Sequence, residues 1–292
     1  MHKIKILIPV YNDWQSLFKL LENINNEAIN IDAELSVLIV NDASTEPRPE
    51  INLNSNNIKS IQVINMKENR GHARCIAAGL KYIFENEEFD YVIPMDGDGE
   101  DRPEEIKQFI DNLNYHPYKP IVGERIKRSE GILFKFCYYA HKTLTFAFAG
   151  HSIKFGNYTC LPKPTVQKMV NEKATWCSFS GSLVKVAKDR ASVPSERGTR
   201  YFSPSKMSYI NLIKHSLSIL AVFRFNLLVR SILFLCIYMF LIYQNITIVM
   251  LIPVISVIAM IVAVFLISKR ESIDGLKKSL ENVLNIENIK QS

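Results

Sequence analysis

The chain has 292 residues, which is enough for one α/β domain of about 200–250 residues and an additional segment. Hydrophobic residues make up 48% and charged residues 22%, which excludes a disordered chain, a collagen-like chain and a disulfide-rich secreted module. The net charge of +6 is too small to indicate a nucleic-acid partner, but it suits work on phosphates or beside an anionic membrane. The five cysteines lack CxxC spacing, so we expect a reducing compartment and neither a thiolate metal site nor disulfides.

The first half of the chain predicts alternating strands and helices. Short apolar runs predict strands at residues 4–10, 35–40, 61–66, 91–95 and 121–124. Helical spacing of apolar residues falls between them, at residues 14–24, 73–84 and 103–113. Strands that alternate with helices over short loops indicate parallel βαβ units, in which ligands bind beyond the carboxyl ends of the strands. We therefore expect Tyr11, Asp42 and Asp96 at one edge of a sheet. The opening run, MHKIKILIPVYND, is too short in its apolar part to resemble a signal peptide.

The middle of the chain gives weaker signals. Residues 131–150 (GILFKFCYYAHKTLTFAFAG) are unusually aromatic for a soluble helix. They could form a core helix or a segment at the lipid interface, where aromatic and lysine side chains anchor. The Ser-, Arg- and Gly-rich residues 175–203 indicate irregular strands and loops, and a helical pattern resumes over residues 206–223.

A long apolar segment predicts a membrane hairpin. Residues 231–268 contain no charged residue. As one straight helix they would measure about 57 Å, against a hydrocarbon core of about 30 Å, so two crossings fit better. Gln244 and Asn245 are the only strongly polar pair, and we place the turn there, within a hairpin of residues 226–268. A buried hairpin in a soluble protein is the alternative.

Basic residues flank this hairpin and predict its orientation. Arg230 is expected to snorkel to the surface of the membrane, and Lys269 and Arg270 end the second crossing. Basic residues at both outer ends place both termini in the cytoplasm. Beyond them, apolar residues at helical spacing predict an amphipathic tail helix, with Ile273, Leu276, Leu280 and Leu284 on one face. That helix could lie on the membrane, on the domain or on a sister subunit, which leaves a homo-oligomer open.

The triplet Asp96-Gly97-Asp98 carries the most chemical information. Two carboxylates that follow a buried strand need a nearby positive charge. Mg²⁺ or Mn²⁺ supplies one, because these ions take one or two carboxylates together with substrate phosphates. Asp-Gly pairs also form ordinary turns, but the βα setting favours a metal.

Two weaker signals accompany the triplet. Asp42 follows a predicted strand and could accept hydrogen bonds from a nucleobase or ribose, or act as a turn residue. Asn69-Arg70-Gly71 precedes a helix with a small-residue face, so the N-terminus of that helix can approach the sheet or a phosphate.

In chain order, the segments PVYND, VNDAS, NRGHARCIAAG and MDGDGEDRPEE resemble the family 2 glycosyltransferases with the GT-A fold. Within that family the chain is similar to the polyprenyl-phosphate glycosyltransferases, the group that includes dolichol-phosphate mannose synthase. The similarity covers about residues 4–230 and extends into the hairpin. VGER at residues 122–125 resembles the family's Gly-x-Arg after the last core strand. The segment from Arg197 to Lys206 resembles its juxtamembrane Arg-x-x-Arg-x-x-Gly-x-Ser-Lys motif.

The chain departs from the family pattern in several places. Trp14 stands where a second acidic residue usually follows Asp13, and Ser203 replaces a glycine. Gly99-Glu100 replaces Leu-Gln after the paired aspartates, and Asn157 stands where an acidic or aromatic acceptor-loop residue is common. These positions bear on donor and acceptor preference rather than on the fold.

The resemblance implies a metal-dependent, inverting transfer of a sugar from a UDP- or GDP-sugar to a polyprenyl phosphate such as undecaprenyl phosphate. It implies a GT-A fold, a Rossmann-like and mostly parallel sheet flanked by helices, followed by the hairpin. The expected nucleotide-sugar-binding residues are Pro9, Tyr11, Asp13, Asp42, Arg70 and Asp96. The expected ligands of Mg²⁺ or Mn²⁺ are Asp96 and Asp98, which form the catalytic set together with Arg125. The expected cations for the acceptor phosphate are Arg125, Arg197, Arg200 and Lys206, because the arginine fork matches phosphate oxygens. An acceptor that is already anionic needs no strong general base.

Two other functions remain open. A glycosyltransferase that acts on a hydroxyl of a saccharide or lipid-linked oligosaccharide would need a carboxylate base, and Glu100 or Asp101 could supply it. An inactive membrane-anchored scaffold would fit the missing second acid, although the intact Asp-x-Asp argues against it.

The expected domain plan has four parts. A cytoplasmic catalytic domain spans residues 1–205, a juxtamembrane amphipathic helix 206–225, the hairpin 226–268 and a cytoplasmic tail 269–292. The Asn-, Ile- and Lys-rich composition is compatible with a bacterium, and thus with its inner membrane.

Overall fold

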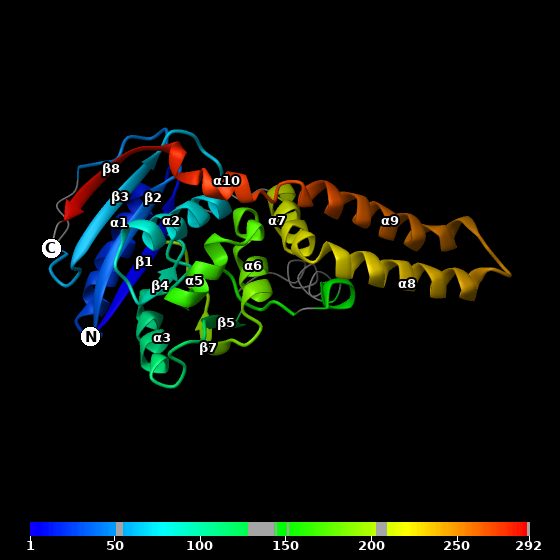
Figure 1. Cartoon of the computed structure of the whole chain (residues 1–292), viewed down its shortest axis with the longest axis horizontal. Coiled ribbons are helices and arrows are strands. Elements are labelled where there is room, and N and C mark those ends of the chain that lie inside the picture. The colour runs from blue at the N-terminus through cyan, green and yellow to red at the C-terminus, as the bar shows by residue number, and fades with distance from the viewer. Residues whose placement is uncertain (51–54, 128–142, 144, 151, 203–208, 291–292) are drawn as a thin grey trace. The chain divides into compact units, whose positions relative to one another are not determined.

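The computed structural model describes residues 1–50, 55–127, 143, 145–150, 152–202 and 209–290 (Figure 1). The chain divides into two compact units. The first, the sheet unit, comprises Met1–Ser129, Lys154–Lys206 and Ile273–Ser292. The second, the hairpin unit, comprises Glu130–Ile153 and Met207–Ser272.

The sheet unit is built on an eight-stranded sheet with the order β7-β5-β6-β4-β1-β2-β3-β8. In this order the strands span Ala191–Glu196, Ile121–Lys127, Thr159–Pro162, Tyr91–Pro94, His2–Val10, Ala33–Asn41, Ser60–Met66 and Val283–Lys290. β4, β1, β2 and β3 are parallel, as are β5 and β7, whereas β6 and β8 run antiparallel to their neighbours. The predicted α/β class with a mostly parallel sheet is confirmed, and so is each of the five predicted strands.

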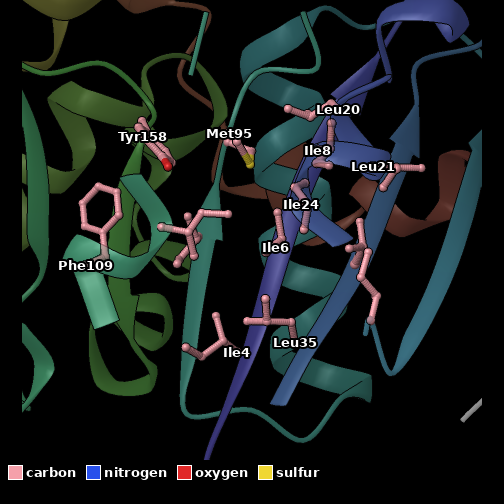
Figure 2. Close-up of a cluster of buried hydrophobic side chains, with 14 of the residues drawn as sticks. Ile4, Ile6, Ile8, Leu20, Leu21, Ile24, Leu35, Met95, Phe109 and Tyr158 are labelled. Atoms are coloured by element: carbon pink, nitrogen blue, oxygen red, sulfur yellow. The ribbon is translucent and has the colours of Figure 1, made fainter. Parts of the chain in front are cut away.

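Alternate side chains of a strand point to opposite faces of the sheet. Both faces of this sheet carry apolar side chains, and helices cover both. They span Trp14–Ala28 (α1), His72–Asn86 (α2), Ile106–Leu113 (α3), Lys163–Val170 (α5) and Phe179–Val186 (α6), with short 3-10 turns at Pro103–Glu105 (η1) and Lys173–Trp176 (η3). Ile4, Ile6 and Ile8 of β1 pack with α1 and α3 in one apolar cluster (Figure 2). Leu7, between them in sequence, packs with α2 in another. A Cβ on Gly79 of α2 would lie 2.3 Å from Leu7 Cδ1, so the helix approaches the sheet this closely because residue 79 is a glycine.

Residues 175–202, the described part of the segment that was expected to be irregular, are more regular than expected. Helix α6 begins after Ser178, whose Oγ accepts a hydrogen bond from Gly181 N at 3.2 Å. Strand β7 follows and pairs with β5. A serine N-cap before an apolar stretch was the available signal for this helix, and the Ser-rich composition concealed it.

The prediction of an amphipathic tail helix is wrong. After the short helix α10 (Ile273–Lys277) and the turn η4 (Ser279–Asn282), the chain forms β8, which pairs antiparallel with β3. The buried Leu276 packs with Ala77 and Trp176. The hydrophobic spacing matched a helix, but the backbone groups along the edge of β3 offered hydrogen bonds that a strand satisfies. The tail therefore belongs to the sheet unit.

In its described residues, the hairpin unit contains three long helices, α7 (Tyr209–Val222), α8 (Arg224–Ile242) and α9 (Ile248–Ser268). By length and composition, α8 and α9 could each cross a membrane. The residues between them, 243–247, include the predicted turn at Gln244 and Asn245. In each helix 11% of the most apolar stretch is buried, which differs from a hairpin enclosed in a soluble core.

Polar contacts join the elements of the hairpin unit. Arg224 at the start of α8 pairs with Glu271 after α9, with 2.7 Å between Nη1 and Oε2. Arg230, which was expected to reach the membrane surface, donates from Nη1 to the carbonyls of Phe146 and Ala147 at 3.1 and 3.0 Å. Those carbonyls belong to the π-helical turn η2 (Thr145–Ala149).

The aromatic segment thus joins the hairpin unit rather than the core of the sheet unit. Phe148 of η2 packs edge-to-face on Phe234 of α8, with 6.1 Å between the ring centroids. The interface interpretation of residues 131–150 stays a prediction. Residues 131–142 and 144 lie outside the described residues.

Candidate active site

The loops that follow β1 and β2 are tied together by Asn12. Its Oδ1 accepts hydrogen bonds from Thr45 N at 2.8 Å and Glu46 N at 3.1 Å, and its own N–H donates to Ser44 Oγ at 2.9 Å. Asn12 has a φ of +50°, a left-handed conformation that asparagine tolerates better than most residues. The bonds hold the carboxyl ends of the two strands in one rigid rim, with Tyr11 exposed beside Asn12.

Asp42 organises the turn before α2. Its two carboxylate oxygens accept hydrogen bonds from Arg70 N at 2.9 Å and Gly71 N at 2.8 Å. Burial raises the pKa of Asp42, and these two bonds partly oppose the shift. Asp42 thus holds the turn in this structure, and its contact with a nucleobase or ribose stays a prediction. It positions Arg70, another predicted nucleotide-sugar residue, rather than facing solvent itself.

The loop after β4 holds Asp96 and Asp98 in a compact fold. Asp96 N donates to Asp101 Oδ2 at 2.9 Å, and Glu100 N donates to Asp98 Oδ1 at 2.9 Å. Gly99 has a φ of +90°, and a Cβ there would lie 2.6 Å from the ring of Tyr201. Residue 99 therefore has to be glycine for this loop to form against Tyr201, which explains one departure from the family pattern.

The Asp96 side chain has polar partners from two other elements. Its Oδ1 lies 3.3 Å from His72 Nε2, at the start of α2, and 3.3 Å from Asn157 Nδ2, before β6. The amide of Asn157 also lies 2.8 Å from His72 Nε2. Burial alone would raise the pKa of Asp96, but the charge and hydrogen bond of His72, with the charge of Arg125, hold it below its usual range.

Asp98 is paired with Arg200. Arg200 Nη1 donates to Asp98 Oδ2, and Nη2 lies 3.4 Å from Asp13 Oδ2. The guanidinium therefore connects the loop after β1 with the loop after β4. Burial, and then the negative charge of Asp96, raise the pKa of Asp98 to about 6, although Arg200 opposes the shift.

The segment of residues 197–201, here called the arginine loop, lies directly on the loop after β4. Arg197 pairs with Glu100 through Nη2 and Oε2. Gly198 N donates to Glu100 O at 2.9 Å, and Tyr201 N donates to Asp98 O at 3.0 Å. Two of the predicted acceptor cations are thus engaged with the predicted metal loop.

Of the other two predicted acceptor cations, the structure describes Arg125 but not Lys206. Arg125 at the end of β5 lies near the carboxylates, since its charge lowers the pKa of both Asp96 and Asp101. Gly156 lies beside it, where a Cβ would be 3.1 Å from Arg125 Nη2. Lys206 lies outside the described residues.

Sequence reasoning missed the contacts of two residues in this cluster, His72 and Asn157. His72 lay within the NRGHARCIAAG segment, and Asn157 was noted only as a departure from the family pattern. A polar side chain directly after the glycine turn was the available signal, but its partner is 24 positions away in another loop. Only the fold brings the two together.

The carboxylates fit a divalent ion that is shared with a phosphate ligand. Among the described residues, no group of three or more His, Cys, Asp or Glu side chains could hold a metal by itself. Asp96 and Asp98 are the smaller donor set that Mg²⁺ uses when substrate phosphates and water complete its coordination. The raised pKa of Asp98 indicates a site where an added positive charge is stabilising.

Comparison with known proteins shows the family of the chain. A family model described as glycosyl transferase family 2 matches residues 5–177. An undecaprenyl-phosphate 4-deoxy-4-formamido-L-arabinose transferase from Salmonella choleraesuis (strain SC-B67) is 22% identical over 219 residues. That match covers 72% of this chain and 64% of the relative, so it spans less than two thirds of the relative's length.

Solved structures share the fold. Glucosyl-3-phosphoglycerate synthase from Mycobacterium tuberculosis, in complex with Mn²⁺, UDP and glucosyl-3-phosphoglycerate, superposes with a TM-score of 0.54 at 12% identity. The match covers 77% of this chain and 80% of that one. A mannosyltransferase from Pyrobaculum calidifontis in complex with GDP-Man and Mn²⁺ has a TM-score of 0.51 at 14% identity, covering 96% and 75%. At these identities the likeness shows the fold alone, which is the GT-A fold expected from the sequence.

Proposed function

The chain belongs to glycosyl transferase family 2, and from this premise we propose that it transfers a sugar from a nucleotide-sugar to the phosphate of a polyprenyl lipid. One observation carries the proposal. Asp96 and Asp98 lie at the carboxyl end of β4 and are surrounded there by His72, Arg125 and Arg200. Carboxylates in such a cluster can share a divalent cation with a diphosphate donor, and the neighbouring cationic side chains can bring an anionic acceptor close to it.

The donor is a nucleoside-diphosphate sugar, with UDP or GDP as the nucleotide. Solved relatives of the fold in complex with UDP or GDP-Man and Mn²⁺ support this class. Asp96 and Asp98 would hold Mg²⁺ or Mn²⁺, which supplies Lewis-acid stabilisation of the leaving diphosphate. Pro9, Tyr11 and Asp13 frame the nucleotide at the rim that Asn12 braces, and Asp42 holds the turn that presents Arg70.

The acceptor is a polyprenyl phosphate such as undecaprenyl phosphate. The name of the Salmonella relative supports this lipid class. The hairpin of α8 and α9 would keep the enzyme at the membrane that contains the lipid tail, with the sheet unit in the cytoplasm of a bacterium. An acceptor phosphate oxygen attacks the anomeric carbon as the bond to the diphosphate breaks. This single displacement inverts the anomeric centre, and no proton has to be removed first.

The ion pairs of the arginine loop give Arg200 two successive partners. Before the donor binds, Arg200 neutralises Asp98. When Asp98 takes part in binding the donor, this guanidinium is released and becomes available to the acceptor phosphate, beside Arg125. Arg197, paired with Glu100, stays as the hinge of the loop. In this scheme the ion pair of Arg200 with Asp98 and its predicted contact with the acceptor phosphate are two states of one side chain.

The geometry disfavours a hydroxyl acceptor. Glu100 is engaged by Arg197, and Asp101 Oδ2 accepts a hydrogen bond from Asp96 N. Asp101 is 5% exposed, and burial raises its pKa well above the usual range. A carboxyl group that is buried and already bonded to a backbone N–H is poorly placed to act as a general base for an incoming hydroxyl.

The test is a transfer assay on the purified full-length protein. It is incubated with Mn²⁺, undecaprenyl phosphate and a panel of UDP- and GDP-sugars, and lipid products are identified by mass spectrometry. We expect one sugar to appear as an acid-labile lipid phosphodiester, and we expect EDTA or Asp98→Asn to abolish it. A product with the sugar on a saccharide hydroxyl, or full activity in EDTA, would contradict the proposal.

A further inference from the structure

Asp96 and Asp98 are held in different ways, and the difference points to a further residue. Asp98 is held by a charged partner, Arg200, on a loop. Asp96 is held by His72 and Asn157 and, through its backbone N–H, by Asp101. Asp98 is also bonded by Glu100 N within its own loop, whereas His72 and Asn157 tie Asp96 to two other parts of the fold.

His72 and Asn157 engage the same oxygen of Asp96. The Asp96 Oδ1 lies 3.3 Å from His72 Nε2 and 3.3 Å from Asn157 Nδ2, and those two nitrogens are 2.8 Å apart. The three groups form a small triangle that connects α2, the loop after β4 and the segment before β6. A ring nitrogen either donates or accepts, so His72 Nε2 cannot donate to Asp96 and accept from Asn157 at once. With Nε2 protonated, His72 and Asn157 Nδ2 both direct a proton at Asp96 Oδ1, from two different elements.

The other oxygen of Asp96 is left open. Among the described residues, no donor lies within hydrogen-bond distance of Oδ2. The side chain of Asp96 is 26% exposed, so this oxygen can reach a ligand from solvent. A carboxylate with one oxygen engaged and one oxygen free is oriented for binding, because rotation about its last torsion would break two contacts.

We propose that His72 is a positioning residue, which together with Asn157 orients Asp96 so that Oδ2 faces the donor and its divalent ion. This inference rests on the proposed function and adds a residue to it. His72 acts through Asp96 and does not touch the donor. In metal sites, residues that hydrogen-bond to a metal-binding carboxylate play the same role, and their loss typically lowers metal affinity or activity about 10- to 100-fold.

The exposed position of His72 makes the test clean. Its side chain is 48% exposed at the first residue of α2, where alanine is well tolerated, so removing the imidazole leaves the core intact. The variants are His72→Ala, His72→Gln and Asn157→Ala. His116→Gln serves as the matched control, because His116 lies after α3, and its backbone N–H bonds only to the end of that helix.

The first measurement is binding, independent of turnover. Mn²⁺ is titrated into the full-length protein in detergent, with UDP and with GDP in separate series, and free Mn²⁺ is followed by electron paramagnetic resonance. We expect His72→Ala to weaken Mn²⁺–nucleotide binding about tenfold. His72→Gln should recover most of the affinity, because a glutamine amide can also donate to Asp96 Oδ1. The control should match the wild type.

The second measurement separates positioning from a structural role. We expect the KM for the donor to rise in His72→Ala more than kcat falls, since Asp96 contacts the donor before and during the reaction. The thermal midpoint without Mn²⁺ should stay that of the wild type. Equal affinity in His72→Ala and wild type, or identical losses in His72→Ala and His72→Gln, would overturn the inference while leaving the proposed function intact. A wild type that binds neither nucleotide with Mn²⁺ would overturn both.

Discussion

Replacing Arg200 with alanine tests whether this arginine competes with the donor for Asp98. In the structure its guanidinium pairs with Asp98 and lies 3.4 Å from Asp13. At an effective dielectric of about 20, the gross attraction of such a charge pair is about 4 kcal/mol, and desolvation cancels much of it. If the Arg200–Asp98 pair opposes donor binding by about 1.4 kcal/mol, its removal raises the affinity for the donor tenfold.

We therefore expect Arg200→Ala to tighten Mn²⁺–nucleotide binding by about tenfold at pH 8. The pH matters because Arg200 lowers the pKa of Asp98, which stands at about 6 with the arginine present. Without Arg200 that pKa rises, so at pH 6.5 a larger share of Asp98 is protonated and the gain should shrink or vanish. The requirement for polyprenyl phosphate should increase at the same time, because the released arginine is no longer there to receive it.

The matched control is Arg197→Ala, which removes the neighbouring ion pair with Glu100 but leaves Asp98 paired. Its Mn²⁺–nucleotide affinity should stay within about twofold of the wild type. Affinity is measured by calorimetry at both pH values, and acceptor dependence by initial rates. If Arg200→Ala weakens donor binding at pH 8, then Arg200 helps to hold the diphosphate and the competition argument is wrong.

The remaining predictions concern the metal site, the hairpin and the tail. Asp98→Asn should reduce transfer by roughly a hundredfold or more with the protein still folded and membrane-bound, checked by product assay and circular dichroism. Because the pKa of Asp98 is raised from 3.8 to about 6 in the folded protein, the stability of the wild type falls as the pH rises between these values, and the full loss is present above them. The stability of Asp98→Asn relative to wild type should therefore be greater at pH 8 than at pH 5, and an equal difference at both would contradict the shift. Gly150→Ala should destabilise the hairpin unit by about 1–3 kcal/mol in thermal denaturation, since φ is +80° there and the new Cβ would lie 2.8 Å from Arg230 Nη2. Leu276→Ala should lower the free energy of unfolding by about 2–5 kcal/mol, because the side chain of Leu276 is fully buried. Leu284, on β8, is 65% exposed, so Leu284→Ala should change that free energy little. Similar losses for both variants would indicate a packed tail helix instead.

The sequence by itself determined the alternation of strands and helices, because that pattern depends on local spacing of apolar residues. Buried strands such as β1 are mostly apolar runs, and in the helices between them apolar residues recur every three to four positions. The pair of apolar helices was also readable, since a charge-free run of that length has few other uses. Asp96 and Asp98 were identifiable because two carboxylates directly after a buried strand repel each other unless a positive charge lies nearby.

Only the tertiary structure decided which partners these residues have. The hydrophobic spacing of the tail fitted a helix equally well, and the open edge of β3 made it a strand. Arg200 was expected to face the acceptor, but the fold lays its loop on the loop after β4 and pairs it with Asp98. His72 meets Asp96 across loops that are distant in sequence. Hydrophobic periodicity is a property of one segment, whereas a hydrogen bond or ion pair depends on the distance between two, and that distance exists only once the sheet has formed.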